Sequence, residues 1–184
     1  MRAKDTEAID GWQRCFIALS PDPATRDVLS AIPVSTRARR VPYEQLHLTV
    51  TFIGALTGEQ GGALAAALAE QSAPLRPTPV THVEHWPNAA RPRLTVATLA
   101  MTDEFTKLDW QVRSLMIEHG LPVDARAFRP HITLARFGRD AGPVEHVTHT
   151  PLNLLAYFES LILYSSTLAR HGARYRALAT TSLR

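Results

Sequence analysis

The chain has 184 residues, of which 45% are hydrophobic and 20% are charged, and its formal net charge is +3 at pH 7. These values are ordinary for one globular domain with a sizeable core, and they exclude disordered, fibrous and collagen-like chains. No apolar run approaches the roughly 20 residues that are needed to cross a bilayer. We therefore expect a cytoplasmic location and no membrane partner, and we treat the chain as a monomer.

Residues 1–13 are polar and aperiodic, and we expect a loose leader followed by a single domain over residues 14–184. Residues 14–19 (RCFIAL) indicate a buried strand, in which the single cysteine is a small core residue rather than a nucleophile. Residues 22–32 predict a short helix that Asp22 caps.

Residues 46–53 (LHLTVTFI) are the clearest strand of the sequence, because apolar and polar residues alternate along them. The alternation predicts one apolar face and one polar face. The apolar face contains Leu46, Leu48, Val50 and Phe52, and the polar face contains His47, Thr49 and Thr51.

The rest of the chain mixes further strands with two helices. Helices are expected at residues 59–71 and 103–119, which are rich in helix-forming or helically spaced apolar residues. Strands are expected at residues 80–86, 93–100, 131–137, 160–168 and 175–180. Because strands and helices do not alternate strictly, the pattern predicts an α+β fold with largely antiparallel sheets.

Two of these strands repeat one motif. The segments LHLTVTFIG and PHITLARFG each contain histidine, any residue, threonine and an apolar residue, and each ends on glycine. The copies lie 84 positions apart, from His47 to His131, which suggests two similar lobes. A third H-x-T, at residues 146–148, lies in a polar, turn-rich stretch, and we interpret it as a chance match.

The two motifs predict a pair of catalytic histidines. Residues i and i+2 of a strand share a face, so each histidine lies beside its threonine. Histidine titrates near neutral pH, so one imidazole can act as a base while another acts as an acid. The hydroxyls of Thr49 and Thr133 can donate hydrogen bonds to oxygens that gain negative charge. This set suits attack on phosphorus, and it needs neither a metal nor another cofactor.

The motifs LHLTV and PHITL resemble those of the two-histidine (2H) phosphoesterases. Within that superfamily the chain is most similar to the LigT/ThpR-like RNA 2′,3′-cyclic phosphodiesterases, also called 2′-5′ RNA ligases. Four segments carry the resemblance, which covers roughly residues 14–181. They are RCFIAL with the P-x-x-x-R helix after it, PYEQLHLTVTFIG, FRPHITLAR and LILYSSTLARHGARYRAL.

The resemblance implies a bilobal fold in which two pseudo-symmetric lobes of antiparallel sheet, with flanking helices, surround a central cleft. It implies that His47 donates a proton and that His131 accepts one. It also implies that Thr49, Thr133 and Arg136 bind the phosphate. The expected reaction is hydrolysis of RNA 2′,3′-cyclic phosphate ends to 2′-phosphomonoesters, with reversible 2′-5′ RNA ligation.

Two positions depart from the family pattern. Val41 stands where the family often has an aromatic residue, although Tyr43 is near. Simple alternation also places Arg136 on the face opposite His131. The strand must end, bulge or twist if Arg136 is to reach the cleft.

Three alternatives stay open on the residues alone. The same site suits a small cyclic nucleotide or ADP-ribose derivative, for which Tyr43, Trp86 and Trp110 are candidate stacking residues. A non-catalytic RNA-binding module would use a basic groove. Its arginines would be Arg37, Arg39, Arg40, Arg91, Arg93, Arg129 and Arg136. A metal site is the third alternative: His82 and His85 are close in sequence, but no H-E-x-x-H motif occurs.

Overall fold

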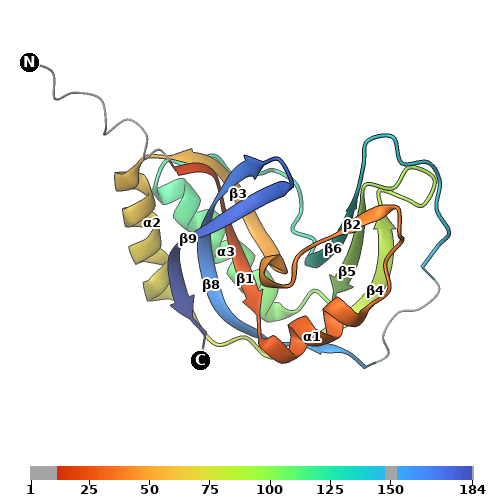
Figure 1. The fold of residues 1–184 in the computed structure, drawn as a ribbon. Coiled ribbons are helices and arrows are strands. Elements are labelled where there is room, and N and C mark those ends of the chain that lie inside the picture. The colour runs from red at the N-terminus through yellow and green to blue at the C-terminus, as the bar shows by residue number, and fades with distance from the viewer. Residues whose placement is uncertain (1–11, 148–152, 184) are drawn as a thin grey trace, which may run out of the picture.

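The computed structural model describes residues 12–147 and 153–183. Most of the expected leader, residues 1–11, and Thr148 of the third H-x-T lie outside the described residues. In chain order (Figure 1) the elements are β1 (Trp12–Pro21), α1 (Pro23–Ala31), β2 (Ala38–Arg40), the 3-10 turn η2 (Tyr43–Gln45), β3 (Leu48–Leu56), α2 (Gly58–Gln71), β4 (Thr78–Trp86), β5 (Leu94–Leu99), α3 (Asp103–Glu118), β6 (His131–Phe137), β7 (Leu155–Ala156), β8 (Phe158–Ala169) and β9 (Gly172–Ser182).

Within the described residues the strands form one sheet of nine strands with antiparallel pairings. The strand order is β7-β4-β5-β6-β3-β1-β8-β9, and β2 pairs with β6. The predicted α+β fold with antiparallel sheets is therefore confirmed.

The sheet divides into two lobes at its centre. There β3 and β6 are joined by the pairing of Leu48 with Ile132. We call the half with β3, β1, β8 and β9 the His47 lobe, and the half with β6, β5, β4, β7 and β2 the His131 lobe. The C-terminal β8–β9 hairpin lies beside β1, so the lobes are not successive halves of the chain (Figure 1).

The helices begin where the sequence provides caps. The Asp22 carboxylate accepts a hydrogen bond from the backbone N–H of Thr25 at 2.9 Å and caps α1, as predicted. Thr57 and Gln60 form a capping box at the start of α2. In Figure 1, α2 and α3 lie together beside the His47 lobe, and both helices contact β3.

Most predicted elements are present, with shifted ends. β6 occupies the predicted residues 131–137, whereas β1 begins at Trp12, inside the expected leader. β2, η2 and β7 are not predicted from the sequence, because segments of two or three residues depend on their contacts with neighbouring segments rather than on a local pattern. Cys15 is buried, as predicted. No helix of the described residues is long and apolar enough to cross a membrane.

Candidate active site

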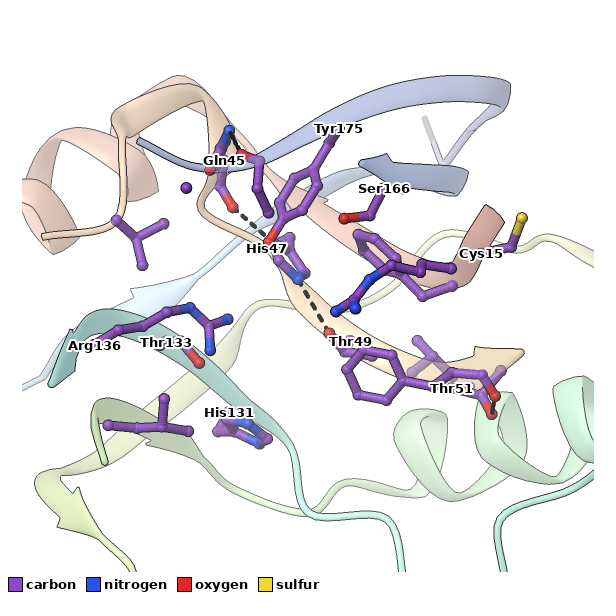
Figure 2. A pocket seen from close by; sticks show the side chains of 18 of the residues that line it. Cys15, Gln45, His47, Thr49, Thr51, His131, Thr133, Arg136, Ser166 and Tyr175 are labelled. Carbon is purple, nitrogen blue, oxygen red and sulfur yellow. Dashed lines mark hydrogen bonds between the residues drawn. The ribbon is translucent and has the colours of Figure 1, made fainter. Parts of the chain in front are cut away.

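A cleft of about 1200 Å³ opens between the two lobes. The residues on either side of the β3–β6 junction line its floor, and its walls include residues 39–42, Gln45, Asp124, residues 126–129 and the tip of the β8–β9 hairpin. The site residues predicted from the sequence all line this cleft (Figure 2). They are His47, Thr49, His131, Thr133 and Arg136.

The junction of the lobes brings the two motifs together. Leu48 pairs with Ile132, and both side chains are fully buried in the core. In an antiparallel pair the flanking residues of the two strands also lie opposite one another, with their side chains on the other face. Each motif histidine therefore lies across from the threonine of the other motif, on the face that lines the cleft.

Each motif histidine is held by the backbone carbonyl two residues before it. His47 Nδ1 lies 2.6 Å from the Gln45 oxygen, and His131 Nδ1 lies 2.6 Å from the Arg129 oxygen. A carbonyl oxygen only accepts hydrogen bonds, so both Nδ1 atoms carry a proton and donate it. Nε2 of each ring is therefore the atom that can exchange a proton in the cleft. His47 Nε2 lies 3.1 Å from Thr49 Oγ1 (Figure 2).

The His47 ring lies among aromatic side chains from three strands. Its centroid is 5.2 Å from that of Phe16 on β1, 5.4 Å from that of Tyr175 on β9 and 6.4 Å from that of Tyr164 on β8. Burial is the main cause that lowers the pKa of His47 to about 4, and the cation of Arg136 acts in the same direction. His47 is therefore mostly neutral at pH 7 when the cleft is empty.

The lowered pKa of His47 makes the stability of the fold depend on pH. A histidine in the unfolded chain has a pKa of about 6.5, so between pH 6.5 and 4 the unfolded chain binds more protons than the folded chain. The contribution of neutral His47 is present above pH 6.5 and is lost as the pH falls through 4. We expect the loss of this contribution to lower the free energy of unfolding by about 2–3 kcal/mol between pH 7 and pH 4.5.

Urea unfolding of the wild type and of His47→Gln at these two pH values measures the effect. The variant should show the smaller drop, because its amide does not titrate. An equal drop in both proteins would contradict the assignment to His47.

His131 has a different set of neighbours. The Trp86 ring centroid lies 4.4 Å from that of His131, and the Arg129 guanidinium lies 4.1 Å from the same indole. Trp86 Nε1 donates a hydrogen bond to the Glu84 carboxylate at 2.7 Å. Partial burial lowers the pKa of His131, and the cations of Arg129 and Arg136 lower it further. Both motif histidines are thus biased towards the neutral form.

Arg136 reaches the cleft because β6 contains a bulge. Two successive residues of β5 pair with Thr133 and Ala135, which leaves Leu134 as an extra residue. Leu134 and Ala135 are both buried, so the alternation shifts by one residue. Arg136 therefore lies on the same side as Thr133 and His131 (Figure 2). Arg136 can reach the cleft only if β6 ends, bulges or twists, and β6 contains a bulge.

The same irregularity occurs at the matching place in β3, and it overturns the prediction for Phe52. Two successive residues of β1 pair with Thr49 and Thr51, so Val50 is the extra residue. Phe52, predicted to face the core, is 63% exposed and lines the cleft. Ile53 is buried instead. The expected alternation is therefore wrong at Phe52, whereas Thr51 lines the cleft as its predicted face requires.

Arginines line both sides of the cleft. Among the described residues there are nine, and they are Arg14, Arg39, Arg40, Arg113, Arg126, Arg129, Arg136, Arg170 and Arg174. Four of the seven arginines proposed for a basic groove are in this set, whereas Arg37, Arg91 and Arg93 are not among the residues that line the cleft. The described cleft residues contain one acidic side chain, that of Asp124. The cleft therefore presents a strongly positive surface to an anion.

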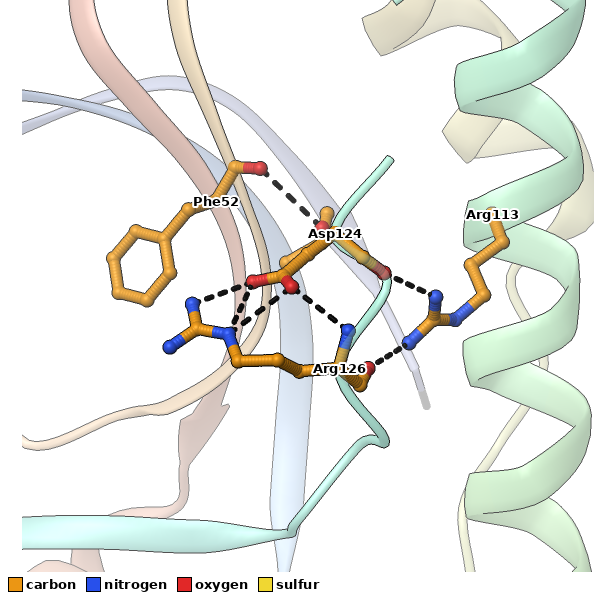
Figure 3. A network of polar contacts seen from close by, with 5 residues as sticks. Phe52, Arg113, Asp124 and Arg126 are labelled. Carbon is orange, nitrogen blue, oxygen red and sulfur yellow. Dashed lines mark hydrogen bonds and ion pairs between the residues drawn. The ribbon is translucent and has the colours of Figure 1, made fainter. Parts of the chain in front are cut away.

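Asp124 is already paired within a polar network (Figure 3). It forms an ion pair with Arg126, whose hydrogen bonds lower the pKa of the Asp124 carboxyl to about 2. Arg113 of α3 donates to the backbone oxygens of Asp124 at 2.6 Å and of Arg126 at 2.8 Å. These bonds anchor this wall of the cleft to α3.

The turn before His47 is fixed from two sides. Arg26 of α1 donates to the Tyr43 carbonyl at 2.7 Å. Gln45 donates through its side chain to the Ala173 carbonyl, at the tip of the β8–β9 hairpin, at 2.9 Å. The Gln45 carbonyl that orients His47 therefore belongs to a turn that hydrogen bonds from α1 and to the β8–β9 hairpin hold in place. The motif alone does not predict these contacts.

The other aromatic candidates are not equivalent. Trp86 lines the cleft, but Tyr43 is not among the cleft residues and donates its hydroxyl proton to the Asp27 carboxylate at 3.0 Å. Trp110 is 68% exposed on α3 and also lies outside the cleft.

His82 is exposed on β4, as expected for a strand surface. In the described part of the chain, no group of three or more His, Cys, Asp or Glu side chains is placed to hold a metal ion.

Solved structures with the same fold cover nearly the whole chain. Escherichia coli LigT in complex with 3′-AMP has a TM-score of 0.74 and 25% identity, over 93% of this chain and 98% of that one. A structure described as a phosphoesterase gives the same values. A Thermus thermophilus protein has a TM-score of 0.72 and 29% identity over the same shares. No protein-family model and no curated protein matches the sequence.

Proposed function

We propose that this chain, which belongs to the LigT-like 2H phosphoesterases, hydrolyses 2′,3′-cyclic phosphate ends of RNA to 2′-phosphomonoesters. One observation carries the proposal. His47 and His131 face one cleft, and a backbone carbonyl at 2.6 Å holds the Nδ1 proton of each ring, so that both Nε2 atoms are available for proton transfer.

In this reaction His131 is the base. Its pKa is lowered, so the ring is neutral at pH 7 and Nε2 carries a lone pair. It removes a proton from a water molecule, whose oxygen attacks phosphorus opposite the bond to O3′. The attack places negative charge on the non-bridging oxygens of the phosphate.

His47 is the acid in the same step. The P–O3′ bond breaks, and protonated His47 delivers its Nε2 proton to O3′, which leaves a 2′-phosphate and a free 3′-hydroxyl. The empty cleft favours neutral His47, since its pKa is about 4. The negative charge of a bound phosphate favours the imidazolium and raises that pKa, so substrate binding prepares the acid.

Thr49, Thr133 and Arg136 hold the phosphate as its charge grows. The two hydroxyls lie on either side of the β3–β6 junction, and the bulge in β6 turns the Arg136 guanidinium towards them. Hydrogen bonds to a developing oxyanion are stronger in the transition state than in the ground state, and so they lower the barrier.

RNA fits this cleft better than a small cyclic nucleotide does. The cleft is larger than the 300–1,000 Å³ of a typical small-molecule pocket. Of its nine arginines, Arg113 and Arg126 form ion pairs with Asp109 and Asp124, and the remaining seven still exceed what one phosphate requires. Escherichia coli LigT holds 3′-AMP in its crystal structure, which supports a nucleotide at the site. With an RNA 5′-hydroxyl in place of water, the same steps would form a 2′-5′ linkage.

The test is incubation with a short RNA that ends in a 2′,3′-cyclic phosphate, in the presence of EDTA. We expect a 2′-phosphate product, resolved chromatographically from the 3′-phosphate. Opening of adenosine 2′,3′-cyclic phosphate but not of the RNA would favour the small-nucleotide alternative. RNA binding without turnover would favour a binding module, and activity that EDTA abolishes and zinc restores would favour a metal site.

Replacing Arg136 with alanine should lower kcat/KM about 10- to 100-fold, because a hydrogen bond from a charged group to the phosphate contributes about 1.5–3 kcal/mol. Arg139→Ala is the matched control, since Arg139 is exposed and is not among the residues that line the cleft. Steady-state rates on the cyclic-phosphate RNA decide the point. Equal rates for the two variants would remove Arg136 from the phosphate site.

A further inference from the structure

The arginines that line the cleft differ in whether their guanidinium groups already have a partner. Within the described residues, five of them contact an acidic side chain, a backbone carbonyl or the Trp86 ring, and these are Arg39, Arg40, Arg113, Arg126 and Arg129. The other four have no hydrogen bond or ion pair in the described part of the chain, and they are Arg14, Arg136, Arg170 and Arg174. Arg136 is assigned to the reacting phosphate, so three cations remain without a role.

These three cations lie at the same end of the His47 lobe. Arg14 is on β1, and Arg170 and Arg174 are in the tip of the β8–β9 hairpin, which pairs with β1 through β8. The start of β1 and the tip of the hairpin are both at the upper edge of this lobe in Figure 1. All three side chains are exposed and line the cleft. Apart from Arg136, the unpartnered positive charge of the described cleft residues is therefore concentrated on one side.

Arg14 has an unusual backbone conformation. Its φ is 49°, in the left-handed region that residues other than glycine rarely adopt. Trp12 pairs with Leu56 and Cys15 with Gly54, so β1 has one extra residue between these pairs and forms a bulge. A Cβ atom added at Gly54 would meet no atom within 4 Å, so there is open space beside the bulge. Strained residues of this kind cluster at ligand sites, which points to a functional placement of the Arg14 side chain.

The position of Arg14 suits a second phosphate rather than the reacting one. Ala18 pairs with Thr49, so Arg14 is four residues along β1 from the level of Thr49. At the rise of a β-strand this separation is about 13 Å. A mononucleoside 2′,3′-cyclic phosphate has one phosphate, and none remains for Arg14 when that phosphate is at Thr49. An RNA with a cyclic end continues from the 5′-oxygen of its last ribose, and each further nucleotide adds one phosphate.

We propose that this end of the His47 lobe binds the RNA strand upstream of the reacting nucleotide, with Arg14 on one backbone phosphate and Arg170 and Arg174 on phosphates beyond it. The proposal rests on the proposed function, because it names the path of the same substrate. A guanidinium can donate two hydrogen bonds to one phosphate, and contacts to phosphates do not depend on the base. The path makes the protein prefer an RNA chain to a mononucleotide without selecting a sequence.

Binding as a function of chain length tests this path and does not need turnover. Titration calorimetry compares a short oligouridylate that ends in a 3′-phosphate with uridine 3′-monophosphate, and the ratio of the two association constants measures the upstream contacts. Arg14→Ala should lower this ratio about tenfold, which is the low end for a hydrogen bond to a charged group. For the oligouridylate it should also reduce the slope of log K against log salt concentration by about 0.7. The double variant Arg170→Ala/Arg174→Ala should lower the ratio as well.

Three further variants separate the charge of Arg14 from its effect on the fold. Arg14→Gly removes the same charge but suits the left-handed backbone, so it should lose the same factor while its thermal unfolding temperature stays at or above that of the wild type. Arg14→Lys keeps the positive charge and should retain most of the salt dependence. Arg139→Ala removes an exposed arginine that is not among the cleft residues, and it should keep the wild-type ratio.

An unchanged ratio in Arg14→Ala and Arg14→Gly would overturn the path. So would a wild type that binds both probes equally, or an equal loss of affinity for both probes in the variants, because that loss indicates a disturbance of the reacting-phosphate site. If the wild type does not turn over cyclic-phosphate RNA but the ratio falls in the variants, the path stands and the proposed reaction fails. If the RNA is turned over and the ratio does not change, the reaction stands and the path fails.

Discussion

Replacing His131 with alanine is expected to lower kcat about 10²–10⁴-fold, and His47→Ala should cost a similar factor. Without the Nε2 atom of His131, the attacking water keeps its proton. Without His47, O3′ must leave as an unprotonated alkoxide. Single-turnover kinetics on an RNA with a 2′,3′-cyclic phosphate end measure the chemical step directly. His82→Ala is the control, because His82 is exposed on β4 and is not among the cleft residues.

The double variant, with both histidines replaced by alanine, should have a kcat only slightly below that of the slower single variant. The two histidines act in one concerted proton transfer, so removing either already disables the step, and such effects are not additive. A folded single variant with a near-normal rate would refute the acid–base pair. A double variant whose loss is the full product of the single losses would show that the histidines act independently.

The histidine pair could be predicted from the sequence because the signal is repeated. One H-x-T strand is weak evidence, but two copies with apolar neighbours require two similar strands. β6 coincides with its predicted range because its first four residues alternate and Gly138 follows its last residue. The convergence of the motifs then depends on a single pairing, Leu48 with Ile132, which links strands 84 residues apart in the chain.

The direction of Phe52 could not be read from its own strand. A bulge shifts the alternation, and local periodicity cannot distinguish a buried phenylalanine from a shifted one. The second motif contained the information that was missing. Arg136 follows His131 by five residues, as Phe52 follows His47, and a charged residue at this position can face the cleft only if β6 contains a bulge. Because the motifs repeat, the same bulge in β3 would have turned Phe52 towards the cleft.

The environments of the two histidines were also beyond prediction. Phe16, Tyr164 and Tyr175 surround His47 from three strands, and Trp86 approaches His131 from β4. These contacts come from residues far apart in the sequence, so no local pattern announces them. They make the site asymmetric although the two motifs are similar. His47 lies among aromatic rings, whereas His131 lies beside Trp86, on which the Arg129 guanidinium stacks.

This asymmetry sets the expected pH dependence of the reaction. The productive state has His47 protonated and His131 neutral. Both histidines have pKa values below the usual 6.5 in the free protein, and that of His47 is about 4. The pH profile of kcat/KM reports the free enzyme, so we expect a bell with its maximum below pH 6.5. On its alkaline side the rate should fall about tenfold per pH unit as the last proton is lost from the pair.

The profile of kcat should instead extend to higher pH, because it reports the bound complex, in which the phosphate anion raises the pKa of His47. Rates measured from pH 4 to 9 at constant ionic strength separate the two curves. Arg136→Ala should move the kcat/KM maximum upward, since its cation lowers the pKa of both histidines. A kcat/KM maximum above pH 7, or a profile that Arg136→Ala leaves in place, would mean that these histidines do not carry the titrating protons.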